Sequence, residues 1–244
     1  MSSVTLLILI FIVAAVYASV GHGGASGYLA VLALAGYAPA QMSTSALVLN
    51  VLVAGLACMA FWRAGHFSWR LTWPFLVTSV PCALVGGWLD VPLHAYQWFF
   101  TVVLLVAAVR LCLPVLPAAQ AVASTGPRCS AAWPIGAGIG LISGIVGVGG
   151  GIFLSPLLVL CRWTSAKEAA AASACFIVVN SAAGLAGRLA GGRCEVGLLL
   201  PLVGVAFVGG WLGSRLGAGY VSNPALCRIL ATVLAVAAMK GLVT

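Results

Sequence analysis

Long apolar stretches alternate with short polar or turn-forming breaks along almost the whole chain. The apolar stretches cover residues 4–34, 43–62, 71–88, 96–113, 133–160, 169–189, 196–212 and 225–243. The breaks contain Gly, Pro, Asn or charged residues, which interrupt regular structure. A helix of about 17–25 residues is needed to cross a hydrocarbon core about 30 Å thick. The pattern therefore predicts an all-α integral membrane protein with eight apolar segments.

The first four segments and the last four carry the same motifs in the same order. The Gly-His-Gly-Gly run at 21–24 corresponds to Gly-Val-Gly-Gly at 147–150, and the Gly-Gly-Trp-Leu run at 86–89 returns at 209–212. An asparagine lies in the second segment of each half, Asn50 in one and Asn180 in the other. We interpret the chain as a duplication. Repeat 1 covers 1–113, a linker covers 114–132, and repeat 2 covers 133–244.

The first segment of each repeat is longer than one membrane crossing requires. Residues 4–34 would form a straight helix about 46 Å long, against a bilayer core of about 30 Å. Each long segment carries its glycine cluster near the middle, and each interior glycine costs a helix about 1 kcal/mol relative to Ala. We therefore predict that both clusters open into two half-helices meeting near the midplane. Paired interruptions of this kind indicate a transporter binding site.

The half-helix that follows each cluster begins with free backbone N–H groups and the positive end of a helix dipole, which suit an anion. The predicted substrate-binding residues come from both breaks and from the helices next to them: His22, Gly23, Gly24, Thr44, Ser45, Asn50, Gly149, Gly150, Ser173 and Asn180. Each also has a purely structural interpretation. The glycines could serve close helix packing, the hydroxyls and amides could bond to their own helix, and His22 could bond to a carbonyl.

Charged residues are scarce, at 6% of the chain, and give a net charge of +8. The 11 Lys and Arg residues stand singly between apolar stretches, which indicates membrane topology and excludes nucleic acid as a partner. The eight cysteines show no C-x-x-C spacing, so neither a disulfide framework nor a metal or other cofactor is predicted. The expected partners are a small anionic solute and the lipid bilayer, and self-association into a homo-oligomer stays open.

Two topologies are compatible with the broken segments. If each folds back as a hairpin, the repeats are inverted and eight cations lie inside against three outside. If each crosses the membrane, the repeats are parallel and the cations divide seven to four. The positive-inside rule therefore favours inverted repeats. The acidic residues Asp90, Glu168 and Glu195 all fall at segment ends, so no span supplies a carboxylate for a proton relay, and export driven by the membrane potential is favoured.

The run Gly-Leu-Ile-Ser-Gly-Ile-Val-Gly-Val-Gly-Gly-Gly at 140–151, continued by Phe-Leu-Ser-Pro-Leu-Leu at 153–158, resembles the signature of the TauE/SafE family of sulfite and organosulfonate exporters. The resemblance extends through the loop at 62–66 and the Gly-Trp-Leu-Gly run that ends at Gly213. It implies a multi-pass protein of the bacterial inner membrane that moves small sulfur-containing or carboxylate anions. The first repeat departs from the usual run, with His22 inside it and Ala-Ser-Gly at 25–27.

Two other functions compete with anion export. The Gly-Ala-Ser-Gly run at 24–27 matches the serine motif of rhomboid-like intramembrane proteases, with Ser26 as the nucleophile, but such a serine needs a histidine base on another helix. His66 and His94 are expected in loops, which argues against this enzyme. An anion channel or a structural subunit is the second alternative, and saturable uptake as opposed to ungated conductance would distinguish a transporter from a channel.

Overall fold

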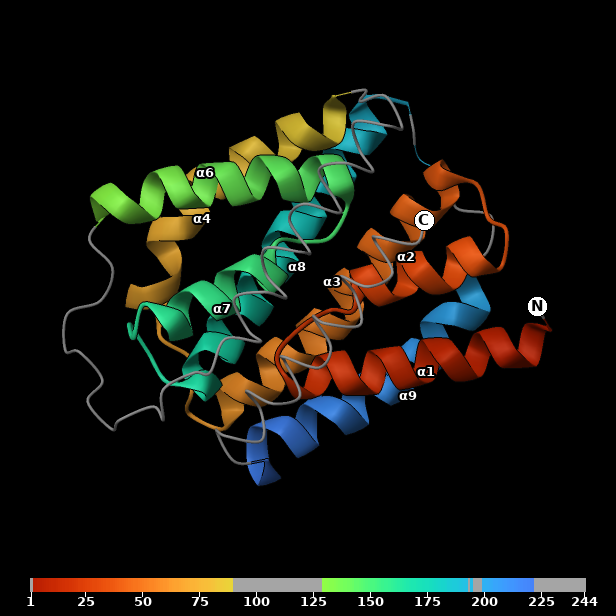
Figure 1. Ribbon diagram of the computed structural model, residues 1–244, viewed down its shortest axis with the longest axis horizontal. Helices are drawn as coiled ribbons and strands as arrows, with labels where there is room; N and C mark the ends of the chain where they lie inside the picture. The colour runs from red at the N-terminus through yellow and green to blue at the C-terminus, as the bar shows by residue number, and fades with distance from the viewer. Residues whose placement is uncertain (1, 90–128, 193, 195–198, 222–244) are drawn as a thin grey trace.

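The computed structural model describes residues 2–89, 129–192, 194 and 199–221, and all the regular structure in these ranges is helical (Figure 1). The predicted segments at 96–113 and 225–243 lie outside the described residues. The elements are α1 (Ser3–Ser19), α2 (Ala25–Leu34), α3 (Pro39–Arg63), α4 (Trp69–Trp88), α6 (Cys129–Val146), α7 (Gly151–Leu160), α8 (Ala166–Ala190), α9 (Leu199–Arg215) and a final π-helical turn, η1 (Leu216–Tyr220).

Five helices of the described chain are long and apolar enough to cross a membrane. They cover Gln41–Arg63, Trp69–Trp88, Cys129–Val146, Ala166–Ala190 and Pro201–Tyr220. This confirms the prediction of an all-helical protein with several membrane-spanning segments. α6 begins at Cys129, so the described helix includes residues 129–132 of the predicted linker, and residues 114–128 lie outside the described residues.

Helical structure stops at both glycine clusters. α1 ends at Ser19 and α2 begins at Ala25, while α6 ends at Val146 and α7 begins at Gly151. Glycines in both gaps have positive φ angles of +76° to +95°, a conformation that L side chains avoid. The chain reverses there, so α2 runs back beside α1 and α7 runs back beside α6 as two hairpins (Figure 1).

The arms of each hairpin differ in length, which corrects the expectation of two half-helices per break. α1 and α6 have 17 and 18 residues, so only the returning arms, α2 and α7 with 10 residues each, are half-helices. Ten residues span about 15 Å, half of a bilayer core. The difference arises because each glycine cluster follows a nearly complete span of helix-forming apolar residues.

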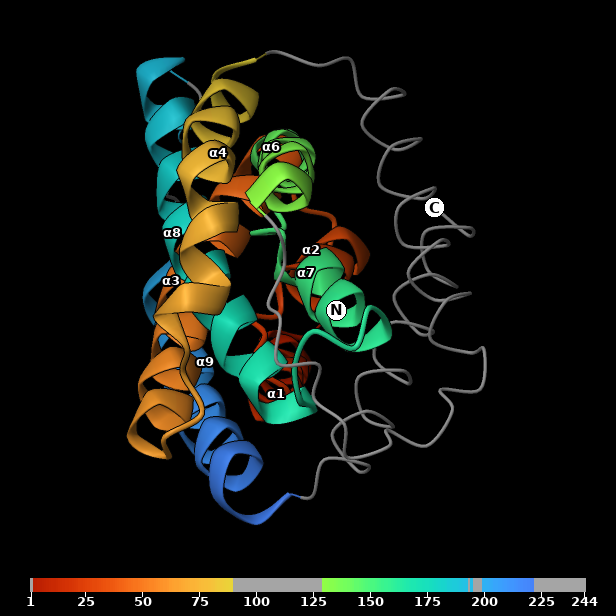
Figure 2. The ribbon, with the colours of Figure 1, turned by 90° about the vertical axis from the view of Figure 1, so that its left-hand side faces the viewer.

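The helices form two layers. Figure 2 shows α3, α4, α8 and α9 in one layer and the two hairpins, viewed nearly along their axes, in the other. Between the layers α4 packs on α6 and α9 packs on α1, while α3 and α8 cross each other and support α2 and α7 respectively. Each of these contacts has a counterpart when the helices α1 to α4 are exchanged with α6 to α9.

Glycines at four-residue spacing bring the layers into backbone contact. On α6 they stand at 136, 140 and 144, and a Cβ atom at Gly140 would overlap the carbonyl oxygen of Ser79 on α4. On α9 and η1 they stand at 209, 213 and 217, and a Cβ atom at Gly213 would overlap the carbonyl oxygen of Ala15 on α1. Small residues allow this close approach of the backbones. It increases van der Waals contact, which holds helices together in a membrane because the lipid tails are as apolar as the helices.

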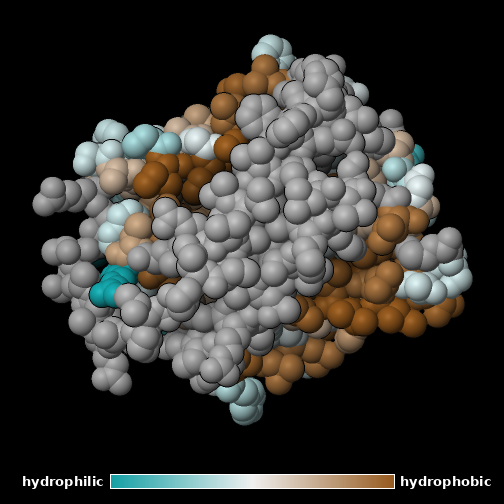
Figure 3. Space-filling view, in the orientation of Figure 1, coloured by the Kyte–Doolittle hydropathy of each residue, from teal (hydrophilic) through white to brown (hydrophobic). Residues whose placement is uncertain are grey.

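One end of the molecule is cationic. The end of α3, the start of α8 and η1 meet there in a cluster of Phe61, Ala170, Ala171 and Ala218. Most described cations lie at this end: Arg63, Arg70, Arg162, Lys167 and Arg215. Arg188, near the opposite end, is buried and donates from Nη2 to the carbonyl oxygen of Ile145. Between the ends the visible outer sides of α1 and α6 are apolar (Figure 3).

Candidate functional site

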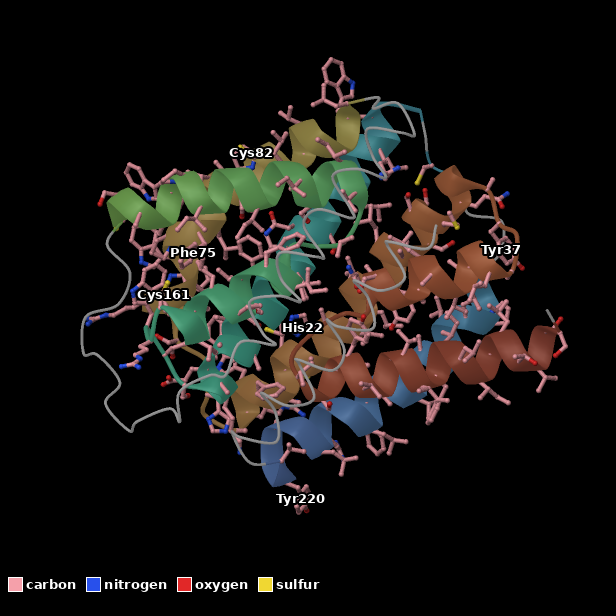
Figure 4. The ribbon with its side chains drawn as sticks, viewed as in Figure 1. His22, Tyr37, Phe75, Cys82, Cys161 and Tyr220 are labelled. Carbon is pink, nitrogen blue, oxygen red and sulfur yellow. The ribbon has the colours of Figure 1, made fainter. Side chains whose placement is uncertain are left out.

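The two glycine breaks meet at the centre of the molecule. In Figure 1 α2 and α7 lie almost end to end with their N-termini directed towards each other, and in Figure 2, viewed nearly along their axes, they overlap. His22, in the first break, lies midway between the ends marked by Tyr37 and Cys161 (Figure 4). All residues of 17–26 and of 146–152 are buried. The chain thus places two helix N-termini within a closed interior.

Asn50 of α3 joins the two breaks. Its Oδ1 accepts a hydrogen bond of 3.0 Å from the backbone N–H of Ala25, the first residue of α2. Its Nδ2 donates to the carbonyl oxygen of Val148 at 3.1 Å and, at 3.4 Å, to Ser181 Oγ of α8. Asn50 is fully buried, so these bonds form where water does not compete. One side chain therefore caps α2 and holds the backbone of the second break.

Among the described residues, the N-terminus of α7 has no such cap. Its N-cap residue Gly150 has left-handed geometry and supplies no side chain to the free amides that follow. Ser143 of α6 lies beside Gly150, since a Cβ atom there would be 3.3 Å from the Ser143 Cβ. The His22 ring lies against the backbone of Gly151. Within the described chain, Ser143 Oγ and His22 Nε2 are both buried without a hydrogen-bond partner.

Other polar groups of the first hairpin are bonded locally. His22 Nδ1 lies 3.0 Å from the carbonyl oxygen of Val20. Tyr17 and Ser26 share a hydrogen bond of 2.8 Å between their hydroxyl oxygens. Since Ser26 is bonded to a tyrosine and not to a histidine, the described geometry lacks the nucleophile–base pair that a serine protease requires.

The structure brings six of the ten predicted binding residues together at the breaks. These are His22, Gly23, Gly24, Asn50, Gly149 and Gly150. Four others contribute differently. Thr44 and Ser45 are buried on α3, Ser173 Oγ accepts a 2.6 Å hydrogen bond from Ser155, and Asn180 Nδ2 donates to the carbonyl oxygen of Phe176 in its own helix. The amide nitrogen of Asn180 is therefore bonded within its own helix, in agreement with the purely structural interpretation of this residue.

The register of α3 and α8 separates the two asparagines. Both helices have 25 residues, and counting from their first residues places Ile177 at the position of Asn50. The contacts agree: a Cβ atom at Gly23 would meet Asn50, and one at Gly149 would meet Ile177 as well as Ser181 and the Asn50 amide. Asn180 lies three residues, almost one helical turn, beyond the matching place, which the sequence motifs alone did not reveal.

Three further polar residues near the breaks were not predicted from the sequence: Ser143, Ser181 and Tyr17. Ser143 lies inside the glycine-rich run at 140–151, so a polar residue within that run was the available signal. Ser181 directly follows Asn180, and Tyr17 precedes the first break by four residues. Among the described residues no three His, Cys, Asp or Glu side chains gather as metal ligands. The donors at the centre are amide N–H groups and hydroxyls, which suit a small anion, and one imidazole lies beside them.

Comparison with known proteins gives a consistent result. The family model "Sulfite exporter TauE/SafE" matches residues 6–241, a range that includes both glycine breaks. The chain is also similar to the probable membrane transporter protein y4hK of Sinorhizobium fredii. The two are 35% identical over 240 residues, which cover 98% of this chain and 97% of the relative. No solved structure matches the chain.

Proposed function

This chain belongs to the sulfite exporter TauE/SafE family, and on that premise we propose that it exports small anions across the bacterial inner membrane. The chain is a multi-pass membrane transporter and not an enzyme. The proposed solutes are sulfite, organosulfonates and related sulfur-containing or carboxylate anions. The proposed binding place is the centre of the molecule, between the two glycine breaks.

The meeting of two helix N-termini at the buried centre is the observation that carries this proposal. Half-length helices with their positive ends at the middle of a membrane protein create an electropositive place without a charged side chain. Broken backbone in a membrane needs protein or water around it, and here Asn50 satisfies part of it. The remaining amides and the buried hydroxyl of Ser143 are available as donors to an anion, and the unpartnered His22 Nε2 is buried beside them.

We further propose that the two halves are inverted repeats. Three observations support this. The hairpins run in opposite directions (Figure 1), the contacts of α4 with α6 and of α3 with α2 have counterparts in those of α9 with α1 and of α8 with α7, and five described cations share one end. Since basic residues are retained on the cytoplasmic side, that end is assigned to the cytoplasm.

A membrane potential is the proposed driving force. Glu168 is the acidic residue that lies within the described part of the chain. It belongs to the first turn of α8, where its side chain accepts hydrogen bonds from Thr164 and Ser165 in a capping box. It is therefore engaged at a helix end and not at the centre. Asp90 and Glu195 lie outside the described residues. An inside-negative potential favours the exit of an anion by about 2.3 kcal/mol per charge per 100 mV.

Flux measurements in proteoliposomes test the proposed function. We expect sulfite efflux that saturates with concentration, increases with an imposed potassium diffusion potential of the correct sign, and needs no proton gradient. A strict requirement for a proton gradient would contradict potential-driven export. Conductance that does not saturate would identify an anion channel. Empty liposomes and liposomes with heat-denatured protein are the controls.

A further inference from the structure

The N-terminus of α2 is already occupied. Its first amide, that of Ala25, donates to Asn50, and its second residue, Ser26, shares a hydrogen bond with Tyr17. The Tyr28 ring packs on Gly24, where a Cβ atom would be 2.9 Å from Tyr28 Cζ. A solute approaching this helix end would have to displace Asn50, which also holds Val148. The N-terminus of α2 is therefore closed to a solute by side chains of the protein itself.

The N-terminus of α7 differs from that of α2 in its side chains. Gly150 supplies no side-chain cap, and two buried polar groups from other elements of the described chain lie beside this helix end. Ser143 comes from α6 and is 1% exposed, and His22 comes from the opposite break and is 2% exposed. A buried polar group without a partner destabilises the folded protein. Two such groups at one uncapped helix end indicate a ligand that the protein binds there.

The hydrogen bond of His22 decides which role its free nitrogen takes. Nδ1 faces the carbonyl oxygen of Val20, which can only accept, so Nδ1 carries the proton. In the neutral imidazole Nε2 is then an acceptor and needs a donor from the ligand. The titratable neighbours in this hairpin are Tyr17 and Tyr28. α8 contacts Gly21 through Ala170, and the charged residues of α8 closest to Ala170 in sequence, Lys167 and Glu168, are both bonded elsewhere.

We propose that the α7 N-terminus alone holds the solute, with Ser143 Oγ and His22 Nε2 as its side-chain ligands. The geometry suits a singly charged oxyanion that keeps one hydroxyl, of which hydrogen sulfite is the example. Its O–H donates to His22 Nε2, and its unprotonated oxygens accept from Ser143 and from the first amides of α7. This assignment rests on the proposed function and adds which break binds and which protonation state is preferred.

Calorimetric titration of the purified protein in detergent tests this assignment. The probes are sodium sulfite at mildly acid pH, where hydrogen sulfite predominates, and sodium methanesulfonate, which has the same charge but no hydroxyl. We expect sulfite to bind more tightly than methanesulfonate. Ser143→Ala should weaken both by about tenfold or more, because a hydrogen bond to an anion is lost. His22→Val, which copies the residue at 148, should remove the preference for sulfite.

Tyr28→Phe is the matched control, because Tyr28 OH is the corresponding unpartnered buried hydroxyl at the α2 end. It should leave both affinities unchanged. The assignment is overturned if Tyr28→Phe weakens binding as much as Ser143→Ala, or if His22→Val keeps the preference for sulfite. Wild-type protein that binds neither probe would overturn the proposed function as well. Melting temperatures check folding, and His22→Gln, which retains a polar group, replaces His22→Val if that variant unfolds.

Discussion

The two glycine breaks have the same backbone design and different side chains. Each breaks a long apolar segment with left-handed glycines and starts a returning helix of ten residues. The first break has His22 and is capped by Asn50, whereas the second has Val148 and faces Ile177 at the matching place. The shared glycines show what the chain reversal requires. The side chains that differ, His22 against Val148 and Asn50 against Ile177, are not needed for the reversal and can therefore give the two breaks different roles.

The largest expected effect is an all-or-none difference in cysteine labelling between the two sides of the membrane, measured on single-cysteine variants. If the halves are inverted, the connections after α3 and after α7 lie on the same, cytoplasmic side. Cys161, exposed in the connection after α7, should then react with a membrane-impermeant maleimide only from the cytoplasm, and Cys194 only from outside. Reaction of Cys161 from outside would instead indicate parallel repeats. Intact cells and inside-out vesicles provide the two directions of access.

Gly149→Ala should damage the second break severely. Gly149 has φ of +76°, and a Cβ atom there would lie 2.6 Å from Ser181 Oγ and 2.8 Å from Asn50 Nδ2. The left-handed conformation alone costs about 1–2 kcal/mol, and the Asn50 bonds would be displaced in addition. We expect loss of most transport and a lower melting temperature. Gly138→Ala in α6, where no atom lies within 4 Å, is the control and should be neutral or slightly stabilising.

Exchange of the two asparagines for leucine should separate their roles. Asn50→Leu leaves the Ala25 N–H and the Val148 carbonyl without their partner, at about 1–3 kcal/mol for each buried group. Asn180→Leu removes only a bond to its own helix and an unpartnered Oδ1, so the change in stability should be much smaller. Thermal unfolding in detergent measures both. Equal destabilisation would show that the breaks depend on the two residues alike.

Ser26→Ala should have the smallest effect. It removes one hydrogen bond with Tyr17, worth about 0.5–1.5 kcal/mol, and leaves the cap from Asn50 in place. Transport should persist in proteoliposomes, and the wild-type protein should not react with a serine-directed phosphonate probe. Covalent labelling of Ser26 by that probe would be the contrary result and would reopen the protease interpretation.

Much of the helical framework followed from local pattern. Apolar runs of membrane length predicted α3, α4 and α8 to within three or four residues at each end, because a lipid environment selects length and hydropathy directly. The capping box at the start of α8 is likewise readable from Ser165 and Glu168, three residues apart. The place of each break was also predictable, since clustered glycines weaken a helix wherever they occur.

Local patterns in the sequence were enough to predict a helical membrane protein with two interrupted segments and few charged residues. Only the packing of distant helices shows that Asn50 rather than Asn180 joins the two interrupted segments, and that Ser143 and His22 lie at the same helix end. The reason is physical. Hydropathy and helix propensity act over neighbouring residues, whereas hydrogen bonds between residues 50 and 148, or proximity of 22 to 151, depend on how distant helices pack.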